Sequence, residues 1–193
     1  MSHTFFAMIS RMKFIERWAL MRNSRQENIC EHSLEVSIIA HALAVISNER
    51  LGNNLHSEKA ALIGIYHDAT EIITGDMPTP IKYYNSSIQL AFKAVEKEAA
   101  GRLLNMLPED LKKSYEEVFI PREEDDYLWK LVKAADKLSA LIKCIEEHKA
   151  GNTEFISAEK SILHLLQDMK LKEVDIFLEE FLPAYQKNLD ELN

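Results

Sequence analysis

Apolar residues recur at intervals of three and four along nearly the whole chain, and no segment alternates apolar and polar residues as a half-buried strand does. This pattern predicts an all-α protein. The expected helices cover 4–18, about 31–51, 57–74, about 87–107, a short piece reaching 115, 123–149, and two segments in the tail, the last bounded near 183.

Glycine, serine and proline mark the expected ends of these helices. Pro78 and Pro80 predict that the segment 76–81 is not helical at its centre. With only 5 glycines in 193 residues, a strand-rich fold or a glycine-rich phosphate loop is disfavoured. The predicted stop and cap residues are Gly52, Ser57, Gly75 and Gly151.

Length and composition predict a single domain over residues 1–193, built as a helical bundle. A chain of 193 residues with 47% hydrophobic content can fold without disulfides or a structural metal. Cys144 falls in an apolar helical run and is expected in the core, while Cys30 lies two residues before His32. A disulfide between the two cysteines is not needed, which fits a reducing cytosol.

The N-terminal residues and the apolar runs predict a cytoplasmic protein without a membrane partner. Residues 1–6 lack the basic start, apolar run and small-residue cleavage site of a signal peptide. No window is expected to reach the apolar length of a membrane span.

The formal net charge of -8 argues against a nucleic acid polymer as the main partner. The charge is uneven, because residues 11–25 carry five basic side chains and one acidic one. Such a basic island suits a small anionic ligand, and a solvated helix face is the simpler explanation. The residues are Arg11, Lys13, Glu16, Arg17, Arg22 and Arg25.

His67 and Asp68 stand side by side in the apolar stretch 60–71, which should be a mostly buried helix. Burying a carboxylate costs several kcal/mol unless a cation or donors meet it, and an imidazole also needs a partner. A divalent metal ion would satisfy both groups. Two more candidate ligands are His32, which opens the second predicted helix, and Asp136, inside the fifth.

Two imidazoles and two carboxylates form a mixed nitrogen and oxygen set that suits manganese, cobalt, iron or zinc better than calcium. The set leaves open positions for water and substrate, as a catalytic site requires. Glu71 follows His67 by four residues and Asp68 by three, on the same helical face. It could transfer a proton near the metal, or simply hold a ligand in place.

The remaining histidines are interpreted as ordinary core or surface groups, because a histidine taken singly is more often such a group than a ligand. Cys30 could approach the metal, but no second cysteine stands at zinc-site spacing. The histidines set aside are His3, His41, His56, His148 and His164.

The order His32, His67-Asp68, Asp136 on an all-α chain resembles the HD-domain metal-dependent phosphohydrolases. The likeness extends to bacterial 5'-deoxynucleotidases of the YfbR type. The segments that carry it are Phe14–Trp18, Leu20–Asn23, Glu27–Leu34, Tyr66–Glu71, Thr74–Pro80, Lys133–Leu138 and Glu146–Phe155.

This resemblance implies one divalent ion, cobalt or manganese first and zinc, iron or copper as alternatives, bound by His32, His67, Asp68 and Asp136. It implies that Arg17 orients the phosphate and that Trp18 packs against the sugar and helps select deoxyribose. Glu71 is the first candidate for general acid/base and Asp76 the second. The implied substrate contacts are Arg17, Trp18, Asp68, Asp76, Met77, Pro78 and Thr79.

The implied reaction is hydrolysis of deoxyribonucleoside 5'-monophosphates to deoxyribonucleosides and phosphate through a metal-activated water, in a homodimer. Two alternatives remain open. One is an HD phosphohydrolase acting on a triphosphate, a cyclic nucleotide or an alarmone. The other is a non-catalytic nucleotide or metal sensor on the same scaffold.

Overall fold

The computed structural model describes residues 2–82 and 84–192, and every regular element within these ranges is helical, which confirms the predicted all-α fold. The α-helices are α1 (Phe5–Ile9), α2 (Ile29–Leu51), α3 (Ser57–Tyr66), α4 (Glu71–Thr74), α5 (Thr79–Lys82), α6 (Ser86–Leu104), α7 (Glu109–Phe119), α8 (Asp126–Lys149), α9 (Ile156–Asp168) and α10 (Lys172–Glu180). The 3-10 helices are η1 (Ser10–Phe14), η2 (Glu123–Asp125), η3 (Thr153–Phe155), η4 (Leu182–Gln186) and η5 (Leu189–Leu192).

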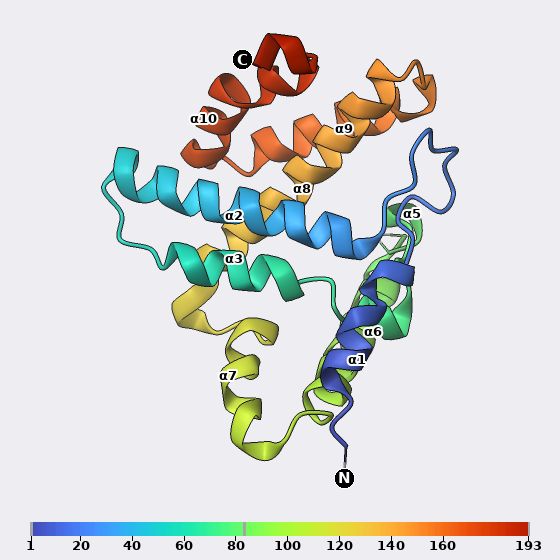
Figure 1. Ribbon diagram of the computed structural model, residues 1–193, viewed down its shortest axis with the longest axis vertical. Coiled ribbons are helices and arrows are strands. Elements are labelled where there is room, and N and C mark those ends of the chain that lie inside the picture. The colour runs from blue at the N-terminus through green and yellow to red at the C-terminus, as the bar shows by residue number, and fades with distance from the viewer. Residues whose placement is uncertain (1, 83, 193) are drawn as a thin grey trace.

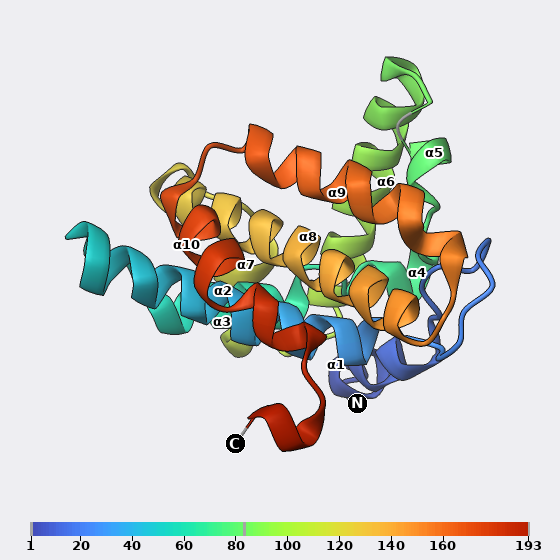
Figure 2. The same cartoon turned by 90° about the horizontal axis from the view of Figure 1, so that it is seen from above.

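Helices α2, α3 and α8 form the centre of the molecule: α2 and α3 run side by side in the middle of Figure 1, and α8 passes behind them. Val36 and Leu43 of α2, Ile63 of α3 and Leu138 of α8 are all completely buried there. Helices α1, α6 and α7 lie on one side of this centre, and α9 and α10 lie on the other (Figures 1 and 2). Burial of apolar side chains from all three central helices holds them together.

Helix α2 begins at Ile29, two residues before the predicted start. The side-chain oxygen of Asn28 caps it by accepting hydrogen bonds from the backbone N–H groups of Cys30 and Glu31, at 3.0 and 3.1 Å. Gly52 ends the helix as predicted, in the left-handed conformation with φ 74°.

The expectation that no window reaches the apolar length of a membrane span was wrong for α2. By length and composition this helix could cross a membrane, with a mean hydropathy of 1.5 over its most apolar window. Its packing explains the composition, because α3, α8 and α10 all contact it. A helix covered on several sides needs apolar side chains on several faces.

The predicted first helix, 4–18, was wrong beyond residue 14. The helical conformation ends at Phe14, and Glu16 forms an isolated antiparallel bridge with Asn28. Arg17 N–H donates to the carbonyl of Glu27 at 2.9 Å in the same pairing. This non-local bridge returns the chain to the start of α2.

The predicted helix over 57–74 is divided into two pieces. Helix α3 ends at Tyr66, residues 67–70 form a turn, and α4 covers Glu71–Thr74. Gly75, with a φ of 71°, follows its end as predicted. Ser57 is the first helical residue and not the cap, and the preceding His56 makes no side-chain cap bond.

Two other boundaries differ from the predictions. Helix α5 begins at Thr79, inside the segment expected to be non-helical at its centre, because Pro80 occupies a first-turn position where its missing N–H has no effect. Helix α7 extends to Phe119, four residues beyond Tyr115, and buries its last two residues in the core.

The C-terminal helices complete the core on the side of α9 and α10. Phe177 of α10 is only 5% exposed, whereas Phe181, just after this helix, is 40% exposed. Cys144 is completely buried in α8, as predicted. Pro183 lies in η4, after the end of the last α-helix.

Candidate active site

His32 enters the site from the first turn of α2, where the Asn28 cap fixes the helix start. Its ring is completely buried, and Nδ1 lies 3.0 Å from the Ser139 hydroxyl of α8. Cys30, two residues earlier, is exposed, so the burial of the histidine does not extend to the thiol.

His67 and Asp68 reach the same place because α3 lies unusually close to α2. A Cβ atom on Gly64 would stand 2.7 Å from the Cα atom of Ser37, so only glycine allows this approach. The helix then ends, and the Nδ1 atom of His67 lies 2.8 Å from the Gly64 carbonyl oxygen. The ring centroids of His67 and His32 are 5.2 Å apart.

The four predicted ligands converge. The Nε2 atom of His32 lies 3.5 Å from Asp68 Oδ2 and 3.2 Å from Asp136 Oδ1. The Nε2 atom of His67 lies 3.1 Å from the same Asp68 oxygen. Ligand atoms of His32, His67 and Asp68 all fall within 4.8 Å of one another, and Asp136 joins them through its contact with His32.

These residues fit a divalent cation. The Nε2 atoms of His32 and His67 are buried, and the polar atoms next to them are carboxylate oxygens, Asp136 Oδ1 at 3.2 Å and Asp68 Oδ2 at 3.1 Å. When the ring hydrogen is on Nδ1, Nε2 cannot donate to these oxygens and is left without a partner. A buried polar atom without a partner is costly, and a cation between the two rings and the carboxylates would satisfy both nitrogens. The two nitrogens and two carboxylates suit a first-row transition metal.

The electrostatics keep the carboxylates ionised. Burial tends to raise the pKa of Asp68, but the charge and hydrogen bond of His67 outweigh it and lower the pKa to about 2. A similar balance, with His32 as the main partner, holds the pKa of Asp136 below its usual range. Burial and the charge of Arg17 lower the pKa of His32. Burial also lowers the pKa of His67, but the charges of Asp68 and Asp136 outweigh burial and raise it, so a cation bound there would replace a proton. Ionised carboxylates and neutral imidazoles are the forms that bind cations.

Glu71 and Asp76 lie close to this cluster. Glu71 is 7% exposed, and its Oε2 atom has no partner among the described residues. Burial, together with the charges of Asp68 and Asp76, raises its pKa to about 9. Burial also raises the pKa of Asp76, although Arg17 opposes the shift. Glu71 is therefore protonated near neutral pH and able to donate a proton.

Arg17 is largely buried against acidic side chains, with 11% of its side chain exposed. Its Nε atom lies 3.0 Å from Glu27 Oε2, and its Nη1 atom lies 3.4 Å from Asp68 Oδ2. Burial opposes its charge, but Asp68 and the other nearby carboxylates raise its pKa above the ordinary value. This guanidinium therefore remains a fixed positive charge next to the candidate metal site.

Trp18 follows with an unusual backbone, a left-handed φ of 58°. Its indole Nε1–H donates to Glu27 Oε2 at 2.9 Å, and its ring packs on Phe155 at 5.3 Å between centroids. Sequence reasoning missed Glu27, although it lies within one of the segments that carry the resemblance. One oxygen of this carboxylate holds both Arg17 and Trp18.

A cavity of about 580 Å³ opens beside the cluster. Predicted residues Arg17, Trp18, Asp136 and Asp76 to Thr79 line it, while His32, His67, Asp68 and Glu71 do not. Sequence reasoning missed the opposite wall, because nothing in the pattern of α9 sets it apart from a core helix. The missed lining residues are Ala19, Leu20, Met21, Pro80, Lys137, Ala140, Ala158, Ser161, Ile162 and Leu165.

The fold is that of the HD-domain phosphohydrolases. An HD-domain phosphohydrolase from Listeria innocua matches with a TM-score of 0.79 and 23% identity, over 95% of this chain and 88% of the other. The HD phosphohydrolase of cyanophage S-2L, solved with dA and one catalytic Zn²⁺ ion, matches with a TM-score of 0.66 and 19% identity. That alignment covers 97% of this chain and all of the phage chain.

Sequence comparison narrows this class to a family. Residues 4–185 match the model of the YfbR-like 5'-deoxynucleotidases. The 5'-deoxynucleotidase of Erwinia tasmaniensis is 46% identical over 98% of this chain and 96% of its own length. The 5'-deoxynucleotidase YfbR of Escherichia coli is also 46% identical, over 98% and 95%. The chain therefore belongs to the YfbR-like 5'-deoxynucleotidase family, which confirms the predicted resemblance.

Proposed function

We propose that this protein is a 5'-deoxynucleotidase, which hydrolyses deoxyribonucleoside 5'-monophosphates to deoxyribonucleosides and phosphate with the help of a divalent metal ion. One observation carries the proposal: two buried imidazole nitrogens and two carboxylates converge beside a cavity that is also lined by a largely buried arginine. Membership of the YfbR-like family supports the choice of substrate class.

His32, His67, Asp68 and Asp136 would hold the ion. When bound, it would polarise a phosphate oxygen and lower the pKa of a neighbouring water. The donor set favours a first-row transition metal over calcium, and the family resemblance puts cobalt or manganese first, with zinc, iron or copper as alternatives.

Arg17 would bind the phosphate. Its guanidinium lies next to Asp68 and lines the cavity, and a planar donor can pair with two phosphate oxygens. Lys137 also lines the cavity. Three further cations have acidic partners away from it: Arg22 is near Glu154, Arg25 is near Glu31, and Lys82 is bonded to Glu96. Two cations at the cavity suit a monophosphate better than the larger charge of a triphosphate or an alarmone.

Trp18 and the segment Asp76 to Thr79 would contact the nucleoside. Trp18 stands at the cavity wall with its indole nitrogen already bonded to Glu27, so its ring offers an apolar surface to the sugar. An apolar surface suits deoxyribose, because a ribose 2'-hydroxyl placed against it would lose hydrogen bonds to water. Apolar side chains of α9 line the opposite wall and would face the base.

Glu71 would donate a proton to the departing sugar oxygen, and Asp76 is the second candidate for this role. A buried acid with a pKa of about 9 retains its proton near neutral pH. A non-catalytic sensor would have no need of such a group beside its metal site, which is evidence against that alternative.

A phosphate-release assay on purified protein tests this function. With Co²⁺ or Mn²⁺ we expect phosphate from dAMP, dGMP and dTMP and little from AMP, dATP or cyclic AMP. Failure to release phosphate from any deoxyribonucleoside monophosphate with any of these metals would overturn the proposal.

Variants separate the roles of the two central acids. Asp68→Asn should lose both metal binding and turnover. Glu71→Ala should bind the metal as well as wild type does and lose roughly 10²- to 10⁴-fold in kcat. Unchanged turnover in Glu71→Ala would remove this residue from the mechanism and leave Asp76 as the candidate.

We also propose that residues 1–193 act as one domain and that the protein is a cytoplasmic homodimer. A single cluster of buried apolar residues extending from Phe5 to Phe177 supports the first point. Leu34, Ile38 and Val45 form an exposed apolar stripe along α2, which supports the second. Sedimentation should give twice the chain mass of 22.2 kDa. Ile38→Glu should give monomers. Leu90→Glu, at an exposed position of α6, is the control and should remain dimeric.

A further inference from the structure

The Nδ1 atoms of His32 and His67, which point away from the candidate metal site, contact different kinds of partner. His67 Nδ1 faces the carbonyl oxygen of Gly64 at 2.8 Å. A carbonyl can only accept a hydrogen bond, so Nδ1 carries a hydrogen, and in the neutral ring Nε2 then has the lone pair that a cation needs. The backbone of α3 therefore fixes the tautomer that can bind a cation.

His32 has a less decisive partner. Its Nδ1 atom lies 3.0 Å from the hydroxyl oxygen of Ser139, and a hydroxyl can either donate or accept. Ser139 also donates to Glu35 Oε2, at 2.5 Å. A carboxylate accepts, so the only hydroxyl hydrogen of Ser139 is directed to Glu35. A lone pair of Ser139 then faces the ring, and Nδ1 must carry the hydrogen.

We propose that Glu35 and Ser139 are positioning residues, which fix the orientation and tautomer of His32 for cation binding. The inference rests on the proposed metal site and deepens it. Glu35 follows His32 by three residues on α2, and Ser139 follows Asp136 by three residues on α8. Glu35, Ser139 and His32 thus form a hydrogen-bonded relay. Each of the two helices supplies one candidate ligand and one of the two positioning residues.

Burial makes the orientation of His32 depend on this relay. His32 and Ser139 are both completely inaccessible to solvent, so water cannot replace a lost hydroxyl at Nδ1. Glu35 is only partly buried and opens to a small side pocket that Glu31 also lines. Partners behind a metal-bound histidine commonly change metal affinity or activity by roughly 10- to 100-fold when they are removed.

Titration of the protein with Mn²⁺ and Co²⁺ tests the relay without reference to turnover. We expect Ser139→Ala and Glu35→Gln each to weaken the binding of both ions by roughly tenfold or more. Glu31→Gln is the matched control, because it removes the same charge from the same helix and side pocket but does not touch Ser139. Its affinity should stay within about twofold of wild type.

Equal weakening in Glu31→Gln and Glu35→Gln would overturn the proposal, since it would indicate a general effect of charge. Wild-type affinity in Ser139→Ala would overturn it as well. If Ser139→Ala does not fold, the partly exposed Glu35→Gln variant decides the question alone. Failure of the wild-type protein to bind either ion would instead contradict the proposed function.

A spectroscopic measurement distinguishes a positioning role from simple packing. In the Zn²⁺-loaded protein labelled with ¹⁵N-histidine, we expect protected Nδ1–H signals from both His32 and His67. Ser139→Ala should shift or broaden the signal of His32 and leave that of His67 unchanged. If the two signals respond alike, or neither responds, the hydroxyl does not select the tautomer of His32.

Discussion

Glu27 shows how one side chain can set the geometry of two others. A single oxygen of its carboxylate accepts hydrogen bonds from Arg17 Nε and Trp18 Nε1, at 3.0 and 2.9 Å. The proposed phosphate and sugar contacts are therefore held relative to each other as well as to the fold. The bond also helps to retain the left-handed backbone of Trp18, which is unfavourable for a side chain of this size.

We therefore expect Glu27→Ala to raise the KM for deoxyribonucleoside monophosphates by roughly 10- to 100-fold, because a hydrogen bond to a charged group contributes roughly 1.5–3 kcal/mol. The preference for dAMP over AMP should fall as well, since Trp18 loses its anchor. Steady-state kinetics on the two nucleotides measures both effects.

Metal affinity should be unchanged in Glu27→Ala, because Glu27 does not touch the four candidate ligands. Glu16→Ala serves as the control, since Glu16 lies in the same bridged segment but is exposed. Similar kinetic losses in the two variants would assign the effect to the segment and not to the carboxylate.

At the scale of single residues, the sequence predicted the convergent quartet because its members belong to a recognisable pattern. Asp76 to Thr79, which the resemblance implies as substrate contacts, line the cavity. The roles of Glu27 and Ser139 could not be predicted, because each depends on a partner supplied by folding. Glu27 approaches Arg17 only through the bridge of Glu16 with Asn28, and Ser139 lies 107 residues from His32 in sequence.

At the scale of elements, the packing of α3 on α2 determines where His67 lies. Gly64 faces the backbone of Ser37, and an added Cβ would meet its Cα atom at 2.7 Å. Backbone atoms of a buried helix cannot yield as a flexible side chain does, so the two helices would have to separate. His67 comes three residues later and would move with α3.

We expect Gly64→Ala to destabilise the protein by roughly 1–3 kcal/mol, as overpacking of a core does, and to weaken metal binding. Gly101→Ala is the matched control, because a Cβ there meets nothing within 4 Å. In the last turn of α6 it should stabilise by up to about 1 kcal/mol through helix propensity. Urea unfolding measures the free energy of unfolding of both variants. Equal changes in the two variants would show that the close approach of α3 to α2 at Gly64 does not require glycine.

Helices α2 and α8 were predicted well because their apolar periodicity is continuous and Gly52 and Gly151 follow their ends. The errors occur where tertiary contacts override local preference. Residues 15–18 leave the helical conformation to pair with the start of α2, and residues 67–70 form a turn that carries His67 and Asp68. Both departures lie at the candidate active site and supply its side chains.

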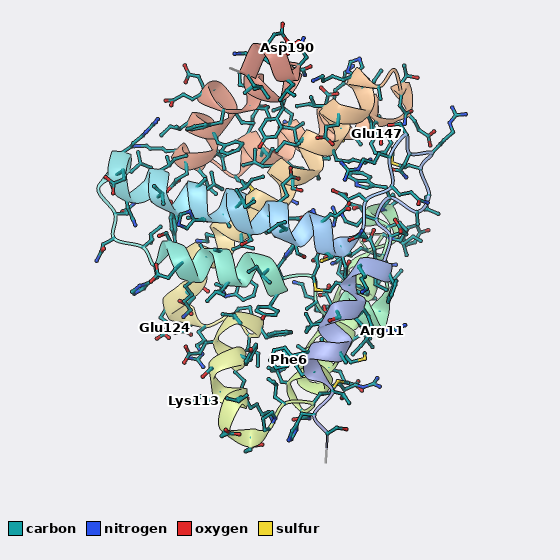
Figure 3. All side chains as sticks on the ribbon, in the orientation of Figure 1. Phe6, Arg11, Lys113, Glu124, Glu147 and Asp190 are labelled. Carbon is teal, nitrogen blue, oxygen red and sulfur yellow. The ribbon has the colours of Figure 1, made fainter. Side chains whose placement is uncertain are left out.

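At the scale of the whole molecule, the substrate cavity requires segments from both ends of the chain. The loop between η1 and α2, residues 15–28, forms one wall and α9 forms another. Glu147, near the end of α8, ties the loop in place by accepting hydrogen bonds from Ser24 N–H at 2.8 Å and Arg25 N–H at 3.3 Å. Figure 3 shows Glu147 where α8, the loop and the start of the C-terminal region meet.

The charge of Glu147 is what makes this tie effective. Burial tends to raise its pKa, but hydrogen bonds from Lys143, Asn152 and Ser24 outweigh burial and lower the pKa to about 2. Because the folded pKa lies below the unfolded value of 4.5, the contribution to stability is complete above pH 4.5. It is lost as the pH falls towards 2.

Acid should therefore loosen the loop, and the loss should depend on this carboxylate. At pH 7 we expect Glu147→Gln to be less stable than wild type by roughly 1–3 kcal/mol, since each unit of pKa shift corresponds to about 1.4 kcal/mol. The difference should shrink below pH 4.5 and nearly vanish close to pH 2, where wild type has also lost the charge. Urea unfolding across this range measures it, with Glu146→Gln, its exposed neighbour, as the control. If the difference in unfolding free energy between wild type and Glu147→Gln does not change with pH, the charge of Glu147 does not hold the loop. Packing of the side chain would then hold the loop against α8 beside the cavity.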